Sequence, residues 1–235
     1  TRRAFLFLIV ILPTCFTCLR AAGVESLIAR MTLEEKLSLI TGARDPHDQG
    51  QAGYWPGLPR LGIPPLRFAD GPGGINAYRD ATALPAPVGL AATFDPEAAR
   101  LYGALLGREA RALGQQVVLA PYVNIVRDPF FRRNHATLGE DPLLNARLAV
   151  EIIRGIQSQG VMAQVKHLAA YNGQDNVYID ERTLREIYLP AFEAAVKAGV
   201  ASVMCAYNRV NGQPCCANDF LLNQVLRNEW GFKGF

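Results

Sequence analysis

Short apolar runs alternate with longer segments of helical periodicity through most of the 235 residues, and this alternation constrains the fold more than any other feature. Apolar runs bounded by glycine, proline or polar loops are typical of buried strands, whereas apolar residues that recur every three or four positions indicate helices. The spacing predicts strand–helix–strand units with right-handed crossovers, and therefore a parallel sheet. We expect strands at 66–70, 117–126, 161–167 and 200–207, and helices at 95–114, 141–160, 181–199 and 218–231.

Local signals mark where several helices begin. Asp95 and Asp141 each precede a proline, which is a favoured combination of an N-cap and a first helical residue. Thr32 and Glu35 form a capping-box pattern, which predicts a further helix near the N-terminus. Residues 43–67 are rich in glycine and proline, so we expect them to form a loop.

Several predicted strands end in polar side chains. Asp70, the adjacent pair Lys166 and His167, and Tyr207 each end a predicted strand, and the charged cluster 127–133 follows another. Because the carboxyl ends of parallel strands meet at one rim, we expect these side chains to converge where α/β folds bind ligands. This convergence predicts an α/β fold of the (β/α)8 TIM-barrel type, incomplete because a full barrel usually needs about 250 residues. The alternative is an open doubly wound sheet, which the missing Gly-rich dinucleotide turn disfavours.

Composition and motifs narrow the classes of function. Half of the residues are apolar, and a formal charge of +3 without any Lys/Arg run argues against nucleic-acid binding. His47 and His135 lie in predicted loops without paired ligand spacing, so we expect no metal site and no cofactor. A nucleophile elbow of the Gly-x-Ser-x-Gly type is absent from the sequence. The polar set at the rim instead suits a neutral polyhydroxylated ligand, because each hydroxyl both donates and accepts hydrogen bonds.

Residues 1–22 are expected to be a signal peptide. Arg2 and Arg3 precede an apolar stretch that runs to about Leu19, and Ala21-Ala22-Gly23 offers a cleavage site next to an unfavourable Arg20. An uncleaved signal anchor is the competing interpretation. Either way we expect the mature domain, residues 23–235, to be secreted or periplasmic, with no stable membrane association once the signal is removed.

Three cysteines remain after the predicted signal. A bridge from Cys205 to Cys216 would close a tight local loop, which is compatible with an exported protein. The alternative is that Cys205, Cys215 and Cys216 all stay reduced in a packed region.

Seven motifs, in order along residues 25–235, carry a resemblance to a known family. They are Phe68-Ala-Asp-Gly-Pro72, Leu84-Pro-Ala-Pro87 with Ala92-Thr-Phe-Asp-Pro96, Pro121-Tyr-Val-Asn-Ile-Val-Arg-Asp-Pro129, Gly139-Glu-Asp-Pro142, Lys166-His167, Glu181-Arg-Thr-Leu-Arg-Glu-Ile-Tyr-Leu-Pro190 and Val203-Met-Cys-Ala-Tyr-Asn-Arg-Val-Asn-Gly212. The chain resembles the N-terminal domain of glycoside hydrolase family 3, of the β-glucosidase type. The resemblance implies a barrel domain, followed in the full enzyme by an α/β sandwich domain that is missing here. It also implies that Asp70, Arg133, Lys166 and His167 contact the non-reducing sugar, and that Met204 and Tyr207 line the same pocket.

The activity implied by this resemblance is that of a retaining β-glucosidase. Its substrates would be small oligosaccharides or aryl and alkyl β-glucosides, from which it removes non-reducing β-D-glucosyl residues. The family's nucleophilic Asp is expected just beyond Phe235 and its acid/base later still, so we expect no catalytic residue in this chain and no activity from it alone. Alternatives are β-xylosidase or another glycone specificity in the same family, or a non-catalytic sugar-binding fragment.

Two departures from the family pattern affect the loop that carries Arg133. The family usually shows Arg-Asp-Pro-Arg-Trp-Gly-Arg, whereas this chain has Arg127-Asp-Pro-Phe-Phe-Arg-Arg133. Ala136 also stands where relatives usually carry a Glu near that Arg. We expect these changes to shift substrate preference or to weaken affinity.

Overall fold

The computed structural model describes residues 23–77 and 80–235, so the predicted signal peptide at 1–22 lies outside the described residues. The chain divides into two compact units, Thr1–Ile40 and Thr41–Phe235. The described part of the first unit contains helices α1 (Val24–Ala29) and α2 (Leu33–Leu39). The backbone N–H of Glu35 donates to Thr32 Oγ1 at 3.2 Å and the N–H of Thr32 donates to Glu35 Oε2 at 2.8 Å, which confirms the predicted capping box. Across the described ranges, no helix is long and apolar enough to cross a membrane.

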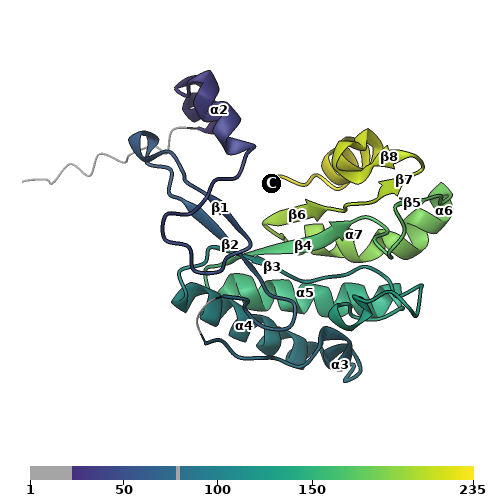
Figure 1. Ribbon diagram of the computed structural model, residues 1–235. Helices are drawn as coiled ribbons and strands as arrows, with labels where there is room; N and C mark the ends of the chain where they lie inside the picture. The colour runs from purple at the N-terminus through teal and green to yellow at the C-terminus, as the bar shows by residue number, and fades with distance from the viewer. Residues whose placement is uncertain (1–22, 78–79) are drawn as a thin grey trace, which may run out of the picture. The chain divides into compact units, whose positions relative to one another are not determined.

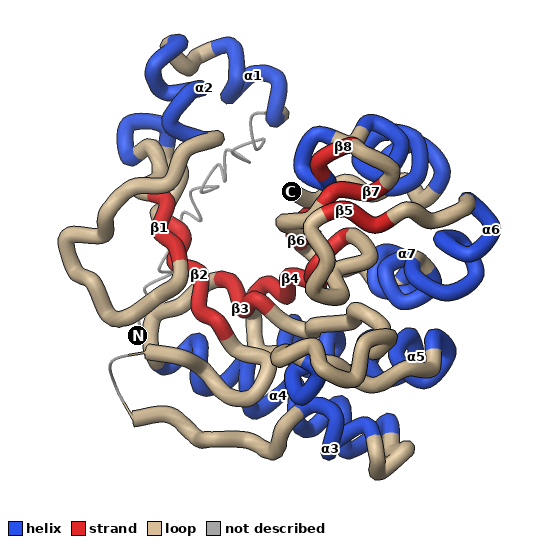
Figure 2. The backbone as a smooth tube through the Cα atoms, turned by 45° about the vertical axis from the view of Figure 1, so that its right-hand side comes forward, coloured by secondary structure: helices blue, strands red, loops and turns tan. Residues whose placement is uncertain are grey.

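The second unit is built on a five-stranded sheet whose strands follow the order of the chain. The order is β1 (Gly53–Trp55), β2 (Leu66–Asp70), β3 (Val117–Leu119), β4 (Met162–Leu168) and β6 (Ser202–Cys205). The strands from β2 to β6 are parallel to their neighbours, and β1 is antiparallel to β2. A doubly wound sheet would reverse its strand order at a switch point, whereas this sheet continues in one direction, as a barrel does. Figure 2 shows the strands along a curve, and the predicted incomplete barrel is therefore confirmed.

Helices cover the convex side of this curved sheet. Figure 1 shows α4 and α5 packed beside the strands, with α7 farther along. The helical segments of the unit are η1 (Pro59–Leu61), α3 (Pro87–Ala91), α4 (Pro96–Ala112), η2 (Asn134–Ala136), α5 (Pro142–Ser158), α6 (Glu181–Thr183), η3 (Leu184–Tyr188), α7 (Pro190–Lys197), η4 (Cys215–Ala217) and η5 (Phe220–Glu229). The side chain of Asp95 accepts the N–H of Glu97 at 2.8 Å, and that of Asp141 accepts the N–H of Leu144 at 2.6 Å. Both predicted N-caps are confirmed.

Helices α4 and α5 approach each other so closely that glycine is required at the crossing. A Cβ atom on Gly103 would lie 2.2 Å from the carbonyl oxygen of Ile152, and one on Gly155 would lie 2.3 Å from that of Arg100. No side chain fits at such distances without moving backbone. Because Gly103 and Gly155 carry no Cβ atom, the two helices can lie close enough together to cover adjacent strands of the curved sheet.

Some element predictions were wrong in detail. Residues 53–55 form β1 and residues 59–61 a 3₁₀ turn, within a segment that was predicted to be loop. The run at 117–126 is a regular strand only to Leu119, after which single backbone hydrogen bonds join it to β4. The helix predicted at 181–199 is divided into α6, the π-helical η3 and α7, because Pro190 has no N–H to continue the hydrogen-bond pattern.

A small second sheet, which the sequence analysis did not predict, lies near the end of β6. It consists of β5 (Asn176–Val177), β7 (Arg209–Val210) and β8 (Gln213–Pro214). Asn211 and Gly212 join β7 to β8 with φ values of 51° and 85°, which is the backbone conformation that Asn-Gly favours in a tight hairpin. A disulfide joins Cys205 to Cys216, which decides between the two alternatives left open by the sequence, and Cys215 remains free and buried.

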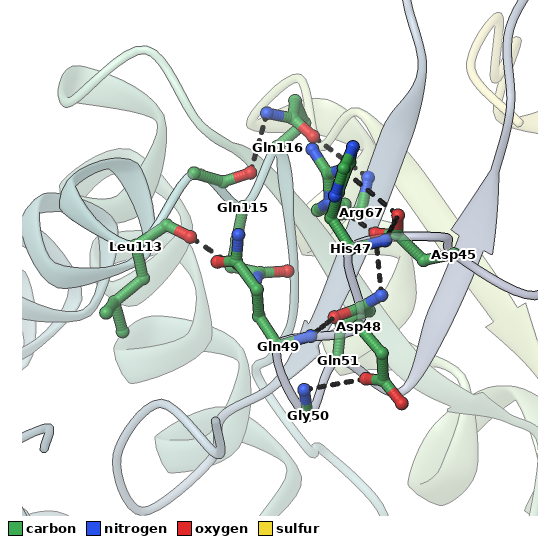
Figure 3. Close-up of polar contacts among 11 residues, drawn as sticks. Asp45, His47, Asp48, Gln49, Gly50, Gln51, Arg67, Leu113, Gln115 and Gln116 are labelled. Carbon is green, nitrogen blue, oxygen red and sulfur yellow. Dashed lines mark hydrogen bonds and ion pairs between the residues drawn. The ribbon is translucent and has the colours of Figure 1, made fainter. Parts of the chain in front are cut away.

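A buried ion pair fastens the segment around residue 45 to the sheet (Figure 3). The carboxylate of Asp45, only 1% exposed, accepts hydrogen bonds from Arg67 Nε at 2.5 Å and Arg67 Nη2 at 3.2 Å. It also accepts from Gln51 Nε2 at 2.8 Å and from the backbone N–H of His47 at 2.9 Å. The Arg67 hydrogen bonds lower the pKa of Asp45. Arg67 itself belongs to β2, and its backbone N–H donates to Gln116 Oε1 at 2.9 Å, just before β3.

We predict that Asp45→Asn lowers the free energy of unfolding by about 3 kcal/mol, because it leaves the Arg67 guanidinium without its buried counter-charge. The measurement is urea denaturation of the purified protein at neutral pH. Asp48→Asn is the matched control: its side chain accepts the N–H of Gly50 at 2.9 Å, an amide oxygen can do the same, and we expect a change below about 0.5 kcal/mol. Equal stability of the two variants would contradict the importance of this ion pair.

Candidate functional site

A buried lysine and a partly exposed aspartate form an ion pair across three strands. Asp70 ends β2 and Lys166 lies in β4, with β3 between them. Lys166 Nζ lies 2.5 Å from Asp70 Oδ1, and the side chains are 2% and 44% exposed, respectively. Burial lowers the pKa of Lys166, and the nearby carboxylate of Asp70 opposes this shift. The ammonium has three N–H donors, of which the ion pair uses one.

His167 follows directly and is held by Asn124, from the segment after β3. Asn124 Nδ2 donates to the carbonyl oxygen of His167 at 2.8 Å, and Asn124 Oδ1 accepts the His167 backbone N–H at 2.9 Å. The same amide oxygen lies 3.3 Å from His167 Nδ1. Because an amide oxygen can only accept, this contact assigns the proton to Nδ1 and leaves Nε2 as an acceptor.

The imidazole of His167 is neutral over the physiological range. Its burial, followed by the positive charges of Lys166 and Arg133, lowers its pKa to about 3. Tyr122 packs edge-on against the ring with centroids 4.7 Å apart, and Tyr171 packs against it at 4.9 Å. The histidine therefore offers a fixed neutral acceptor beside a cation.

Arg133 brings a second positive charge to the site from the loop after β3. Its guanidinium carbon lies 5.1 Å from the ring centroid of Tyr122 and 5.7 Å from that of Tyr171. Such cation–π contacts orient a guanidinium while its N–H groups stay available as donors. No carboxylate pairs with Arg133 in the part of the chain that the structure describes.

Met204 and Tyr207 complete the predicted set. Met204 is the direct β6 neighbour of Lys166 in the parallel register. Tyr207 is 83% exposed, and its ring centroid lies 6.5 Å from that of His167 and 6.0 Å from that of Tyr171. The structure therefore brings together all six residues predicted for the site. Arg127, from the same charged cluster, instead lies over the ring of Tyr188, 5.9 Å from its centroid.

The sequence analysis did not identify three residues that contact the site. Tyr122 and Asn124 follow β3, and Tyr171 follows β4, so all three leave the sheet at the rim. Their position after a strand was a usable signal, but only the folded chain shows that they hold His167 and Arg133. Within residues 23–77 and 80–235, no group of three His, Cys, Asp or Glu side chains could hold a metal ion.

Comparison with known proteins identifies the family. Residues 57–235 match the N-terminal domain of glycosyl hydrolase family 3. The chain belongs to this family. It is 55% identical to a β-glucosidase from Streptomyces venezuelae solved in complex with D-glucose, with a TM-score of 0.85 over 89% of this chain and 27% of that one. The high TM-score shows that the chain has the same fold as the matching part of that enzyme, and the curved sheet in chain order agrees with a partial barrel.

Two further β-glucosidases are also similar to this chain. β-Glucosidase 3B from Thermotoga neapolitana, solved with α-D-glucose, is 40% identical, with a TM-score of 0.86 over 91% of this chain and 33% of that one. The thermostable β-glucosidase B from Acetivibrio thermocellus is 41% identical over 92% of this chain and 30% of its own. The chain therefore spans about a third or less of the length of these family 3 relatives.

The lowered pKa of His167 predicts a pH dependence of stability. Since the unfolded histidine takes up a proton near pH 6.5 and the folded one only near pH 3, stability falls as the pH decreases through this window. Between pH 7.5 and 5.0 the wild type should lose about 2 kcal/mol more than His167→Gln, measured by urea denaturation. His135→Gln, at an exposed histidine of η2, is the matched control. Parallel losses in wild type and His167→Gln would show that the folded histidine titrates normally.

Proposed function

We propose that this chain forms the glucose-binding part of a retaining β-glucosidase, an enzyme that removes non-reducing β-D-glucosyl residues. The observation that carries this proposal is the buried ammonium of Lys166. Asp70 takes one of its hydrogen bonds, and no acceptor for the other N–H groups is found among the described residues. A buried donor without a partner is costly, so hydroxyl groups of a bound sugar are suitable partners. The relatives described above as β-glucosidases, two of them solved with glucose, support the same function.

Each side chain of the site has a distinct role in this proposal. Asp70 accepts hydrogen bonds from sugar hydroxyls, while Lys166 and Arg133 donate to hydroxyl oxygens. His167, neutral and protonated on Nδ1, accepts a hydrogen bond from a sugar hydroxyl on Nε2. Met204 and Tyr207 contribute apolar surface to the wall of the site. This mixture of donors and acceptors fits a ligand whose hydroxyls both donate and accept, and it fixes the orientation of the ring before reaction.

The chemical step needs groups other than these. A retaining glycosidase uses a carboxylate nucleophile and an acid/base carboxyl about 5 Å apart. Asp70 is already paired with Lys166, so we assign it to binding. Following the family pattern, we propose that both catalytic carboxylates come from sequence beyond Phe235, and that residues 1–235 alone do not hydrolyse glycosides.

We also propose that the protein acts outside the cytoplasm. The disulfide between Cys205 and Cys216 supports this location, because such bonds persist in oxidising compartments. The basic and apolar segment at residues 1–22, with its features of a signal peptide, is the second support. Fractionation of the source cells, with detection of the mature N-terminus, tests both points.

The glucosidase proposal predicts a large effect of Lys166→Met in the full-length protein. We expect kcat/KM on p-nitrophenyl β-D-glucoside to fall about a hundredfold, since a charge-assisted hydrogen bond to the sugar is lost. The inhibition constant for D-glucose should rise in the same variant. Lys197→Met is the matched control, because Lys197 is 71% exposed on α7, where it pairs with Glu193 on the same helix.

Two results would contradict the proposal. The first is a folded Lys166→Met variant, verified by circular dichroism, that keeps wild-type kcat/KM and glucose inhibition. The second is wild-type full-length protein that hydrolyses no β-glucoside.

A further inference from the structure

A two-residue turn, Ala169 and Ala170, connects the end of β4 to Tyr171. Both alanines are fully buried, and they lie beyond the regular pairing of β4 with β6, which ends at Leu168. Ala170 has a φ of 56°, in the left-handed region that residues with a Cβ atom rarely adopt. Such a conformation costs free energy and persists only where surrounding contacts hold it. The contacts of this turn therefore decide where the ring of Tyr171 lies.

The side-chain amide of Asn208 holds this turn from the loop after β6. Its Nδ2 donates to the carbonyl oxygens of Ala169 and Ala170, at 3.3 and 3.4 Å, and lies 3.2 Å from that of Arg209. The carbonyl group of Ala169 belongs to the peptide group before Ala170, and the carbonyl group of Ala170 belongs to the peptide group after it. One amide nitrogen thus contacts the peptide groups on both sides of the left-handed residue and restricts the rotation of both.

The backbone that carries Asn208 is itself held in place. Its carbonyl oxygen accepts the N–H of Cys215 at 3.0 Å, and the disulfide between Cys205 and Cys216 closes the loop that contains it. The thiol of Cys215 also lies 3.7 Å from the carbonyl oxygen of Ala169. The loop after β6 and the turn after β4 are therefore joined at more than one point, and the amide of Asn208 starts from a fixed backbone.

The amide of Asn208 acts through its nitrogen. Three carbonyl oxygens face Nδ2, whereas Oδ1 is buried without a hydrogen-bond partner among the residues that the structure describes. The reverse orientation would place an oxygen against three other oxygens, so the nitrogen is assigned to this side. A buried oxygen without a partner is costly, and an apolar side chain of similar size would avoid that cost. What this position supplies is therefore a pair of N–H donors.

Tyr171 connects the turn to the charged and polar side chains of the site. Its ring centroid lies 4.9 Å from that of His167 and 5.7 Å from the guanidinium carbon of Arg133. Tyr122 contacts the same two residues, at 4.7 and 5.1 Å, so both are held by two tyrosine rings. A shift of the turn at Ala170 would move one of these two rings and release His167 and Arg133 on that side.

We propose that Asn208 is a positioning residue of the glucose site. It fixes the turn at Ala170, the turn fixes the ring of Tyr171, and this ring orients His167 and Arg133 toward the sugar. The inference rests on the proposed glucosidase function and adds to it a residue that acts through other side chains. Because small displacements of binding groups weaken both binding and reaction, the loss of the amide donors should lower affinity and turnover together.

The test replaces the amide in the full-length protein by groups that differ in their donors. Asn208→Leu is similar in size and has no donor, whereas Asn208→Asp presents a carboxylate to the three carbonyl oxygens at neutral pH. At pH 7.5 we expect kcat/KM on p-nitrophenyl β-D-glucoside to fall about tenfold in both variants, and the inhibition constant for D-glucose to rise about as much. Asn228→Asp, at an exposed residue of η5, is the matched control and should keep the wild-type values.

A lower pH separates a positioning role from a purely structural one. A buried carboxyl that faces only oxygen atoms has a raised pKa, so Asn208→Asp takes up a proton and regains one O–H donor between pH 7.5 and 5.0. Its kcat/KM relative to wild type should then rise about fivefold, whereas that of Asn208→Leu should stay low. His167 and Cys215 do not titrate in this range, because burial lowers the pKa of the imidazole to about 3 and raises the pKa of the thiol.

Each remaining outcome decides against the proposal. Folded Asn208→Leu protein, checked by circular dichroism, with wild-type kcat/KM and glucose inhibition would overturn it. Equal pH profiles of the Asp and Leu variants would do the same. If neither variant folds, Asn208 supports the fold as a whole, and a role in the site is overturned. In all three cases a wild type that hydrolyses the β-glucoside leaves the proposed function intact. If the wild type does not hydrolyse it, the inference falls together with that function.

Discussion

The ion pair between Lys166 and Asp70 is the interaction on which the rest of the site depends. A buried ammonium is costly unless it is paired, and Asp70 supplies the counter-charge from a strand two places away. The pair requires β2, β3 and β4 to end at one rim, which the parallel order of the curved sheet provides. The charges of Lys166 and Arg133 in turn help to keep His167 neutral. The buried ammonium of Lys166 therefore depends on the order of the strands, and its charge in turn helps to set the protonation state of His167.

The outer part of the site is supported by contacts between loops. Tyr207 is exposed, but the disulfide of Cys205 holds the chain two residues before it. One residue after it, Asn208 Nδ2 lies within hydrogen-bond distance of the carbonyl oxygens of Ala169 and Ala170, at 3.3 and 3.4 Å. These contacts connect the end of β6 to the end of β4. An exposed ring on a fixed backbone is well placed to meet a ligand without a large cost in ordering.

The strand ends were predictable from the sequence, whereas the residues that orient them were not. Asp70 and Lys166 each end an apolar run. Parallel strands bring such ends to the same rim of a sheet, and this does not depend on the conformation of the loops that follow. Asn124 and Tyr171 reach His167 only through the three-dimensional course of irregular segments, which periodicity does not describe. Strand β1 has three residues, too few to show alternation. Family resemblance supplied Arg133, but only the structure shows that tyrosine rings orient it, where the sequence lacks the usual Glu.

The most direct test of this account is a crystal structure of the full-length protein in complex with D-glucose. The account predicts one glucose molecule with hydroxyls in hydrogen-bond contact with Asp70, Lys166 Nζ and His167 Nε2, and with Arg133 turned toward it. Glucose bound elsewhere in the protein, with Lys166 contacting only Asp70, would contradict the account.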